Sequence, residues 1–246
     1  MNTNTIHDLR SFLDALRAAG ELSEIHQPVS LQHELGAVLN ACERAGKASM
    51  FHQVQGHSIP VVGSLLGSPR RIAIALGCDQ AGVSPRMAAA TEQPIKPVLF
   101  ADAQSGAGSK TAPCQEVVIR EKDLKKPGKG VDILPIPIST PGYDNAPYIT
   151  MSFYATKDPD TGVQNLGCYR AQVKAHNRVG LNMSLESGKD GHAHWLKWKK
   201  LGKPMPAAIV LGGPPCVLYV GGMKVPPGVD EITIAGGLVG QPLNVI

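Results

Sequence analysis

The chain of 246 residues has few aromatic residues, no paired cysteine motif and no long apolar run. Its five cysteines are odd in number and share no CxxC spacing, which argues against a disulfide framework or a zinc ribbon and favours a reducing compartment. No run approaches the roughly 18 apolar residues of a membrane-spanning helix. The N-terminus lacks the basic and apolar regions of a signal peptide. These absences predict a cytoplasmic protein without a membrane span.

Familiar nucleotide-binding motifs are missing as well. No GxGxxG follows a predicted strand, and "GAGSKT" at 106–111 has the wrong spacing for a Walker A loop. No serine stands in a nucleophile elbow. The net charge is only +4, and the lysines of "EKDLKKPGKG" and "WLKWKKLGK" are typical of solvated faces. The sequence therefore disfavours a Rossmann-type cofactor site and a nucleic-acid partner.

The composition and the residues that begin and end helices predict a globular protein of two domains. Hydrophobic residues make up 43%, while 27 glycines and 20 prolines indicate many turns. Thr5 and Asp8 resemble a capping box, with Gly20 placed to end the helix. Its apolar stripe comprises Leu9, Phe12, Leu13 and Leu16. A second helix is expected between Ser30 and Gly46, "IPVVGSLLG" is typical of a strand and "SPRRIAIALG" of a helix. Residues 1–110 are predicted to form a small α/β domain.

The remainder, residues 111–246, differs in its proline content and in its predicted secondary structure. Four prolines within "VDILPIPISTPGYDNAPYIT" predict an extended segment crossing the surface. Strands are expected at 148–156, 164–174, 179–184, 207–211 and 216–222, with one helix around "HAHWLKWKKLG". Short strands separated by glycine-rich turns favour a β-barrel-like domain over a doubly wound sheet. The predicted fold class is therefore α+β.

One predicted strand, "NLGCYRAQV" at 165–173, carries unexpected residues. Asn165 and Gly167 share one face by period-two alternation, whereas Arg170 falls on the other. A carboxamide oxygen is a hard ligand suited to Mn²⁺ or Mg²⁺, and an arginine can pair bidentately with a carboxylate. If one site uses both, the strand must twist or bulge near Cys168. Taken alone, Asn-x-Gly is more typical of a turn and Tyr-Arg of a surface pair.

Several stretches together resemble the UbiD-type decarboxylases, which use prenylated flavin mononucleotide (FMN). They are "DLRSFLDALRAAGEL", "MFHQVQGHSIPVVGSLLGSPRRIAIALG", "DILPIPISTPGYDNAPYIT", "NLGCYRAQV" and "PAAIVLGGPPCVLYVGGMKVPPGVDEITIAGGLVG". They follow the family's order from about residue 8 onward. The resemblance implies that residues 111–246 form a split β-barrel that binds the flavin.

The resemblance also implies a metal that bridges to the flavin phosphate. Asn165 and Glu231 correspond to two ligands, and Glu231 is selected over Asp230 because it precedes "ITIAGGLVG". Many relatives have a histidine as the third ligand. By its distance from Arg170, Glu186 falls near that position here. His192 and His194 remain alternatives, although a pair at a helix start is the favoured interpretation of both.

Further residues correspond to cofactor and substrate contacts. Arg170 is implied to be the catalytic residue that faces the substrate carboxylate. The implied flavin-binding set comprises Cys168, Tyr169, Arg170, Asn182, Met183, Ser184, Ser187, Gly188, Met223 and Lys224. The implied cofactors are prenylated FMN and Mn²⁺ or Mg²⁺, with K⁺ as a further ion.

The resemblance implies reversible, non-oxidative decarboxylation of an aromatic, heteroaromatic or α,β-unsaturated acid. The flavin would act as an electron sink for loss of CO₂, and a flavin prenyltransferase would supply it. In the family, two further glutamates and a C-terminal domain with oligomer contacts lie beyond the point that matches "QPLNVI". The sequence is therefore expected to be the N-terminal portion of a homo-oligomeric enzyme and to turn over little acid alone. A non-catalytic flavin- or metal-binding subunit and a split-barrel flavin reductase remain alternatives.

Overall fold

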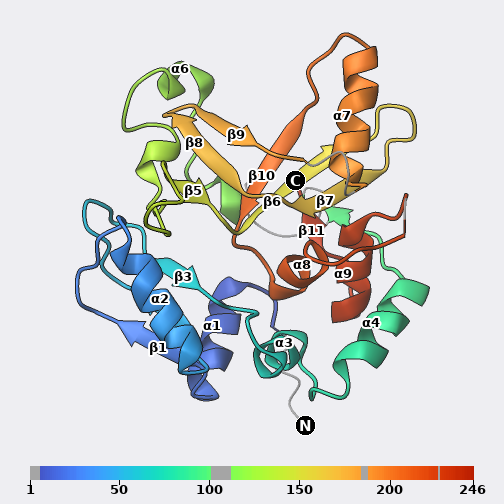
Figure 1. The fold of residues 1–246 in the computed structure, drawn as a ribbon. Helices are drawn as coiled ribbons and strands as arrows, with labels where there is room; N and C mark the ends of the chain where they lie inside the picture. The colour runs from blue at the N-terminus through green and yellow to red at the C-terminus, as the bar shows by residue number, and fades with distance from the viewer. Residues whose placement is uncertain (1–5, 101–111, 184–187, 227) are drawn as a thin grey trace.

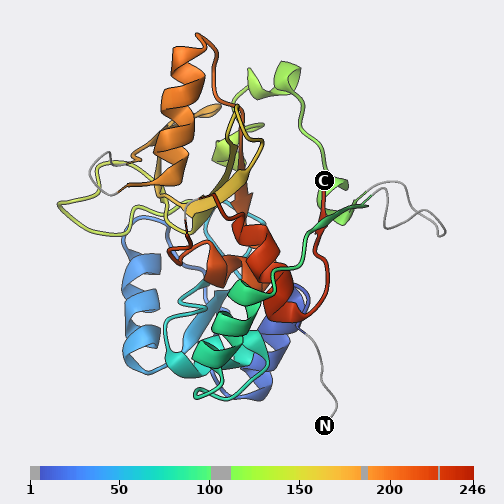
Figure 2. The ribbon, with the colours of Figure 1, turned by 90° about the vertical axis from the view of Figure 1, so that its right-hand side faces the viewer.

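The computed structural model describes residues 6–100, 112–183, 188–226 and 228–246 (Figures 1 and 2). They form the predicted mixture of α and β structure. The first part contains α1 (Leu9–Ala18), β1 (Leu22–Ile25), α2 (Glu34–Arg44), β2 (Ala48–Phe51), β3 (Val61–Gly63), α3 (Pro69–Leu76), α4 (Val83–Glu92) and β4 (Val98–Leu99). The rest contains the 3₁₀ helices η1 (Pro113–Gln115) and η2 (Val131–Ile133), helices α6 (Glu121–Leu124), α7 (Asp190–Lys200), α8 (Pro215–Val220) and α9 (Glu231–Val239), and strands β5 (Tyr148–Ile149), β6 (Ser152–Lys157), β7 (Gln164–Cys168), β8 (Ala171–Ala175), β9 (Arg178–Leu181), β10 (Ala207–Leu211) and β11 (Asn244–Val245).

Helix α1 begins one residue after its capping residue, Asp8. The Asp8 carboxylate accepts a hydrogen bond of 2.8 Å from the Ser11 N–H, and Ser11 Oγ accepts one of 3.2 Å from the Asp8 N–H. The capping box is therefore formed by Asp8 and Ser11, whereas the predicted Thr5 lies outside the described residues. The predicted stripe is buried at Phe12, Leu13 and Leu16. Gly20 has a φ of 70°, so the predicted end of the helix is confirmed.

The first sheet has the order β1-β2-β3, in which β1 and β2 run parallel and β2 and β3 antiparallel. Ile25 lies opposite Phe51 at the end of the parallel pair. The His52 N–H then donates a hydrogen bond of 3.0 Å to the Ile25 carbonyl. The two residues that follow these strands, His26 and His52, are therefore neighbours, with their rings stacked.

Two three-stranded antiparallel sheets, β10-β6-β7 and β5-β8-β9, dominate the second part (Figure 1). The chain passes from one sheet to the other at Tyr169 and Arg170, between β7 and β8. The single strand expected at 164–174 is thus broken where a twist or bulge was predicted. Within the described residues no strand pairing joins the two sheets, so they do not form a closed barrel.

The prediction of a strand at 216–222 is wrong, because most of these residues belong to helix α8, which ends at Val220. Pro215 occupies the first turn of α8, where a missing N–H does no harm. The helix is buried on nearly all sides, so its sequence is apolar without a helical period. A short apolar run of this kind fits a buried strand or a buried helix equally well.

Helix α9 was not predicted from the sequence, and it contains two adjacent glycines. A Cβ on Gly236 would lie 2.5 Å from the Ile95 carbonyl oxygen. A Cβ on Gly237 would lie 2.9 Å from the carbonyl oxygen of Ala90 in α4. The glycines therefore allow α9 to pack closely against α4 and the segment after it, although glycine weakens a helix by about 1 kcal/mol relative to alanine.

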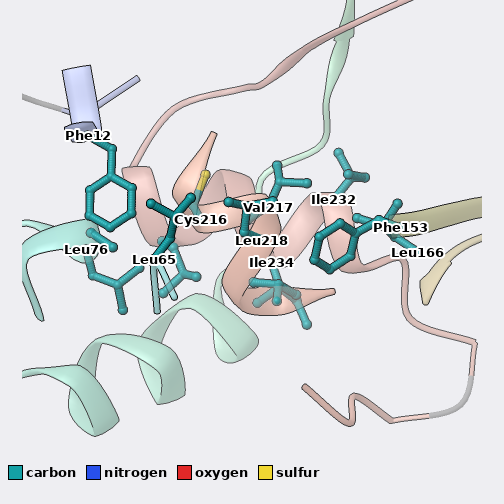
Figure 3. Close-up of a cluster of buried hydrophobic side chains, with 14 of the residues drawn as sticks. Phe12, Leu65, Leu76, Phe153, Leu166, Cys216, Val217, Leu218, Ile232 and Ile234 are labelled. Carbon is teal, nitrogen blue, oxygen red and sulfur yellow. The ribbon is translucent and has the colours of Figure 1, made fainter. Parts of the chain in front are cut away.

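The largest hydrophobic core joins both parts of the chain (Figure 3). Phe12 and Leu76 reach it from α1 and α3, and Phe153 and Leu166 reach it from β6 and β7. Ile234 of α9 lies between them and is fully buried. The predicted boundary at 110/111 falls in the segment outside the described residues and stays a prediction.

Across the described part of the chain, no helix combines the length and the apolar character needed to cross a membrane.

Candidate functional site

A pocket of about 280 Å³ lies at the outer edge of β7, beside the turn after α8 and the start of α9. Its lining residues are Asn165, Leu166, Gly167, Cys168, Tyr169, Gly188, Lys189, Asp190, Gly221, Gly222, Met223, Lys224, Val225 and Glu231. The structure thus brings together both predicted metal ligands that it describes, Asn165 and Glu231. It also brings Cys168, Tyr169, Gly188, Met223 and Lys224 of the predicted flavin-binding set to the same pocket.

The pocket forms here because β7 is an edge strand whose outward N–H groups bond to later segments. The Leu166 N–H donates to Glu231 Oε2 at 2.8 Å. The Cys168 N–H donates to the Gly221 carbonyl at 3.1 Å. These two bonds hold the first residue of α9 and the turn after α8 against the strand. They place Glu231 in the same wall as Asn165.

Glu231 is a carboxylate in a buried position at the start of α9. Its neighbour Asp230 caps the helix by accepting a 2.9 Å bond from the Ile232 N–H. Only 4% of Glu231 is exposed, and burial raises the pKa of its carboxyl to about 7, against the opposing hydrogen bond from Leu166. A cation in the pocket would favour the charged form.

Asn165 lies across the ladder from Thr156 and is 6% exposed. Its Nδ2 atom has no hydrogen-bond partner within the described residues. A buried amide N–H group without an acceptor is rare, and it points to a missing acceptor and not to a missing cation. The carboxamide and the Glu231 carboxylate both offer hard oxygen donors, which Mn²⁺ and Mg²⁺ prefer. The donor set therefore fits a divalent cation.

Gly167 is required by the side chain of Tyr169. A Cβ at position 167 would lie 2.5 Å from the Tyr169 hydroxyl and 2.6 Å from its ring carbons. A Cβ on Gly191, at the start of α7, would lie 2.9 Å from the same hydroxyl. The Tyr169 ring thus folds back over β7 into the space that these glycines leave. The space beside Gly167 is therefore filled by the protein's own phenol.

Two lysines bring positive charge to the pocket. Lys224, a predicted cofactor neighbour, follows the turn after α8. Lys189 was not singled out from the sequence. It occupies the N-cap position of α7 without a capping hydrogen bond from its side chain, and its ammonium lies 5.9 Å from the centre of the Tyr169 ring. Burial raises the pKa of the Cys168 thiol, and the charge of Lys189 opposes that rise.

Arg170, the predicted catalytic residue, does not line this pocket. It is exposed, with its guanidinium 5.3 Å from the centre of the Tyr148 ring. Its guanidinium therefore lies beside β5 of the second sheet. Its role toward a substrate stays a prediction.

Five other predicted site residues lie away from the pocket or outside the described residues. Asn182 and Met183 follow β9, and Met183 packs with Tyr154 and Tyr169 beside the pocket without lining it. Glu186, the predicted third ligand, lies outside the described residues, as do Ser184 and Ser187.

The two histidines of α7 support the helix-start interpretation. His194 Nδ1 lies 3.0 Å from the Thr156 hydroxyl, on the side of α7 that faces β6. Burial lowers the pKa of its imidazole. The His192 ring packs against Trp195, with 5.4 Å between the ring centres. Neither histidine lines the pocket that holds Asn165 and Glu231.

Two family profiles match the chain. The 3-octaprenyl-4-hydroxybenzoate carboxy-lyase N-terminal domain matches residues 13–91, and the Rift-related domain of the same carboxy-lyase matches residues 105–246. The second match alone spans more than half of the sequence. The chain therefore belongs to the UbiD family, and the resemblance found in the sequence is confirmed.

Relatives and solved structures agree with this assignment. An uncharacterized protein of Aquifex aeolicus (strain VF5) is 32% identical over 97% of this chain and 50% of its own length. The UbiD-class enzyme HmfF from Pelotomaculum thermopropionicum, in complex with FMN, superposes with a TM-score of 0.85 at 30% identity, over 97% of this chain and 50% of that one. An evolved dimeric form of HmfF, in complex with prenylated FMN, gives 0.83 at 30% identity, over 97% and 52%.

A third structure is the vanillic acid decarboxylase of Sedimentibacter hydroxybenzoicus in closed form. It superposes with a TM-score of 0.82 at 26% identity, over 97% of this chain and 50% of that one. The chain thus spans about half the length of the relatives it matches.

Proposed function

We propose that this chain is the cofactor-binding portion of a UbiD-type decarboxylase that uses prenylated FMN and a divalent metal. The proposed substrate class is an aromatic, heteroaromatic or α,β-unsaturated carboxylic acid. The observation that carries the proposal is the pairing of two buried oxygen donors, Asn165 and Glu231, in one pocket. The complexes of HmfF with FMN and prenylated FMN support a flavin in the same family.

In this proposal the metal is held by the Asn165 carboxamide and the Glu231 carboxylate, with Mn²⁺ or Mg²⁺ as the ion. Glu186 is proposed as a third ligand from its place in the sequence. When bound, the prenylated flavin supplies an electron sink that allows CO₂ to leave. The protein's contribution is to orient the reacting groups and to shield them from water.

We assign the anionic end of the flavin to the side of the pocket that carries Lys189 and Lys224. Among the described residues no side chain caps the start of α7, so its N-terminal end adds the positive side of a helix dipole at Gly188 and Lys189. The flavin ring system is assigned to the less polar part of the lining, which is formed by Cys168, Tyr169 and Met223. Arg170 is proposed to hold the substrate carboxylate, because its guanidinium is exposed and it directly follows Tyr169, which lines the pocket.

The two sheets β10-β6-β7 and β5-β8-β9 are proposed to be the two halves of the family's split barrel. The chain crosses between them at Tyr169 and Arg170. A flavin bound along β7 would then lie on one side of this crossing and the substrate carboxylate on the other. This placement would explain why Tyr169 lines the pocket and Arg170 does not.

A non-catalytic binding subunit is the second candidate, and one observation favours it. Asp190 and Glu231 are the carboxylates that line the pocket within the described residues. Glu231 is assigned to the metal, so Asp190 in the first turn of α7 is the one carboxylate left among the described lining residues to protonate a product carbon. A binding subunit would hold flavin and metal without turnover.

The test is a titration of the purified chain with Mn²⁺ and FMN, using electron paramagnetic resonance for the ion and fluorescence for the flavin. Removing a ligand or its support commonly costs about 10–100-fold in affinity, so N165A and E231A should weaken both. Exposed residues of the same types give the matched controls N177A and E116A. Full Mn²⁺ and FMN binding by E231A would refute the assignment.

Co-expression with a flavin prenyltransferase separates the two candidates. Native mass spectrometry would report the bound prenylated flavin in both cases. CO₂ release from an aromatic acid by the loaded chain would favour the enzyme and exclude the non-catalytic subunit.

A further inference from the structure

A second cluster of metal-ligating side chains lies in the first sheet, away from the pocket at β7. Glu24, His26 and His52 each offer one ligand atom, and these three atoms lie within 4.8 Å of one another. The cluster arises from the topology. Glu24 and His26 are two residues apart along β1 and its extension, so they share one face. His52 follows β2, which runs parallel to β1.

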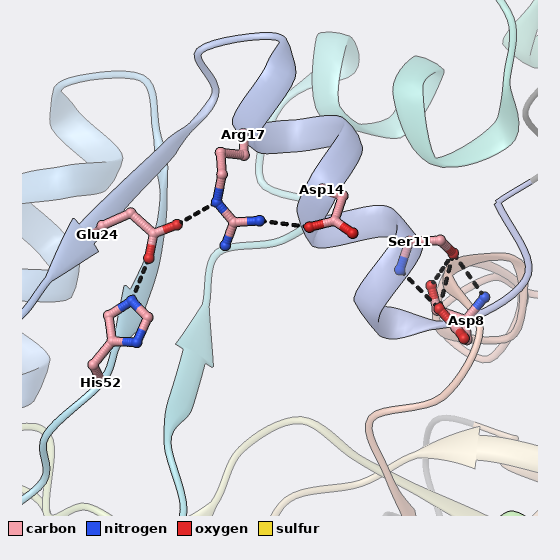
Figure 4. Close-up of polar contacts among 6 residues, drawn as sticks. All are labelled: Asp8, Ser11, Asp14, Arg17, Glu24 and His52. Atoms are coloured by element: carbon pink, nitrogen blue, oxygen red, sulfur yellow. Dashed lines mark hydrogen bonds and ion pairs between the residues drawn. The ribbon is translucent and has the colours of Figure 1, made fainter.

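The Glu24 carboxylate has a separate partner for each oxygen (Figure 4). Oε1 accepts a hydrogen bond of 2.7 Å from Arg17 Nε, and Oε2 faces His52 Nε2. Arg17 is in turn held by Asp14 at 2.6 Å. Arg17 thus fixes the orientation of the carboxylate and leaves Oε2 to face His52. An outer partner of this kind commonly orients a metal-binding carboxylate.

The two imidazoles are stacked, with 4.3 Å between their centres and 7° between their planes. His26 is exposed, and Glu24 and His52 keep 26% and 33% of their side-chain surface exposed. An ion could therefore reach the cluster from solvent and keep an open coordination position.

We propose that Glu24, His26 and His52 form a binding site for a borderline divalent transition metal, Zn²⁺ in the first place. Two imidazole nitrogens and one carboxylate oxygen are a donor set typical of open zinc sites. Mn²⁺ and Mg²⁺ prefer oxygen donors, so this site differs in chemistry from the one at Asn165 and Glu231. A bound ion would link the ends of β1 and β2 and neutralise the charge of Glu24.

A plain ion-pair network is the competing explanation of the cluster. In that case Glu24 is satisfied by its contacts with His52 and Arg17, and His26 only covers the His52 ring. The two explanations differ in the role of His26. It makes no hydrogen bond to Glu24 in the structure, so only a metal site requires its nitrogen.

The experiment is a calorimetric Zn²⁺ titration of the E231Q chain, which lacks the carboxylate of the β7 pocket. We expect one Zn²⁺ per chain, with binding at least about tenfold weaker in E231Q/H26Q and in E231Q/H52Q. E231Q/H7Q, which changes a histidine outside the cluster, should bind like E231Q. Repeating the series on the otherwise unchanged chain with excess Mg²⁺ covers the case in which E231Q does not fold.

Replacing Zn²⁺ by Co²⁺ adds a direct readout, because the visible absorption of Co²⁺ reports nitrogen ligation. Loss of this absorption in both histidine variants would support the site. No Zn²⁺ binding to E231Q, or unchanged binding in either histidine variant, would overturn it in favour of the ion-pair network. Neither outcome depends on flavin binding, so the proposed function is tested separately.

Discussion

The N–H of Leu166 and the carboxylate of Glu231, 65 residues apart in sequence, form a hydrogen bond of 2.8 Å at the edge of β7. This bond matters for the position of α9 and for the availability of the carboxylate to a ligand. It fixes the start of α9 against the strand, and it uses only one oxygen of the carboxylate. The other oxygen can then take part in ligand binding.

Substitutions at Glu231 should separate these two contributions. E231Q keeps an oxygen that can accept the Leu166 hydrogen bond, whereas E231A leaves a buried N–H without a partner. An unsatisfied buried donor costs about 1–3 kcal/mol, so E231A should lower the free energy of unfolding by that amount relative to E231Q. Urea unfolding of both metal-free variants measures the difference. Equal stabilities would show that the bond is structurally unimportant.

Lys189 should discriminate between a flavin with a phosphate and one without. If its ammonium pairs with the phosphate, K189M should weaken FMN binding about tenfold, in line with a charge-assisted hydrogen bond. Riboflavin has no phosphate, so its affinity should not change. The exposed Lys203 supplies the matched control K203M. An equal loss of FMN and riboflavin affinity in K189M would point to a distorted pocket instead of a phosphate contact.

Gly167 and Tyr169 should be strongly coupled. A Cβ at 167 would lie 2.5–2.6 Å from the phenol, so G167A should lower the free energy of unfolding by about 1–3 kcal/mol and displace the ring. G167A should cost much less in a Y169A background, because the ring that causes the clash is gone. A double-mutant cycle in urea measures this coupling. Additive effects would mean that the strand shifts to accommodate the methyl group.

Asp158 should make the chain sensitive to acid. The hydrogen bond from Lys197, at 2.6 Å, lowers the pKa of the Asp158 carboxyl from 3.8 to about 2. The folded state therefore binds the proton less tightly than the unfolded state. The stability contributed by Asp158 is present above pH 4 and is lost as the pH falls toward 2.

The D158N variant should lose part of its stability at pH 6 but show a flatter decline between pH 4 and 2. Urea unfolding at several pH values makes the comparison. D160N is the matched control, because Asp160 contacts the same lysine from a more exposed position. A decline in D158N as steep as in the unchanged chain would assign the acid sensitivity to other groups.

Local signals in the sequence predicted the helices near the N-terminus well. Gly20, with a φ of 70°, ends α1. Ser68 caps the start of α3 and the left-handed Gly77 ends it, and all three signals depend on a few neighbouring residues. The pairing of Asn165 with Glu231 in one pocket was predicted as well, but through the family resemblance. No local pattern reports that residues so far apart share a wall.

Long-range packing explains what the sequence did not predict. Helix α8 was taken for a strand because its burial on all sides removes the helical period. Helix α9 was missed because Gly236 and Gly237 are poor helix formers, and their benefit lies in contact with α4 and the segment after it. Lys189 was missed because only the start of α7 beside β7 brings its ammonium to the Tyr169 ring.

The hydrophobic core of Figure 3 has a consequence for how the molecule unfolds. Two family segments meet in it, yet Phe12 and Leu76 from the first and Phe153 and Ile234 from the second bury one another's surface. Separating the segments would expose the apolar side chains against which α8 and α9 pack. We therefore expect the two family segments to unfold together, and loosening of the N-terminal helices to weaken the support of α9 and Glu231 at the edge of β7.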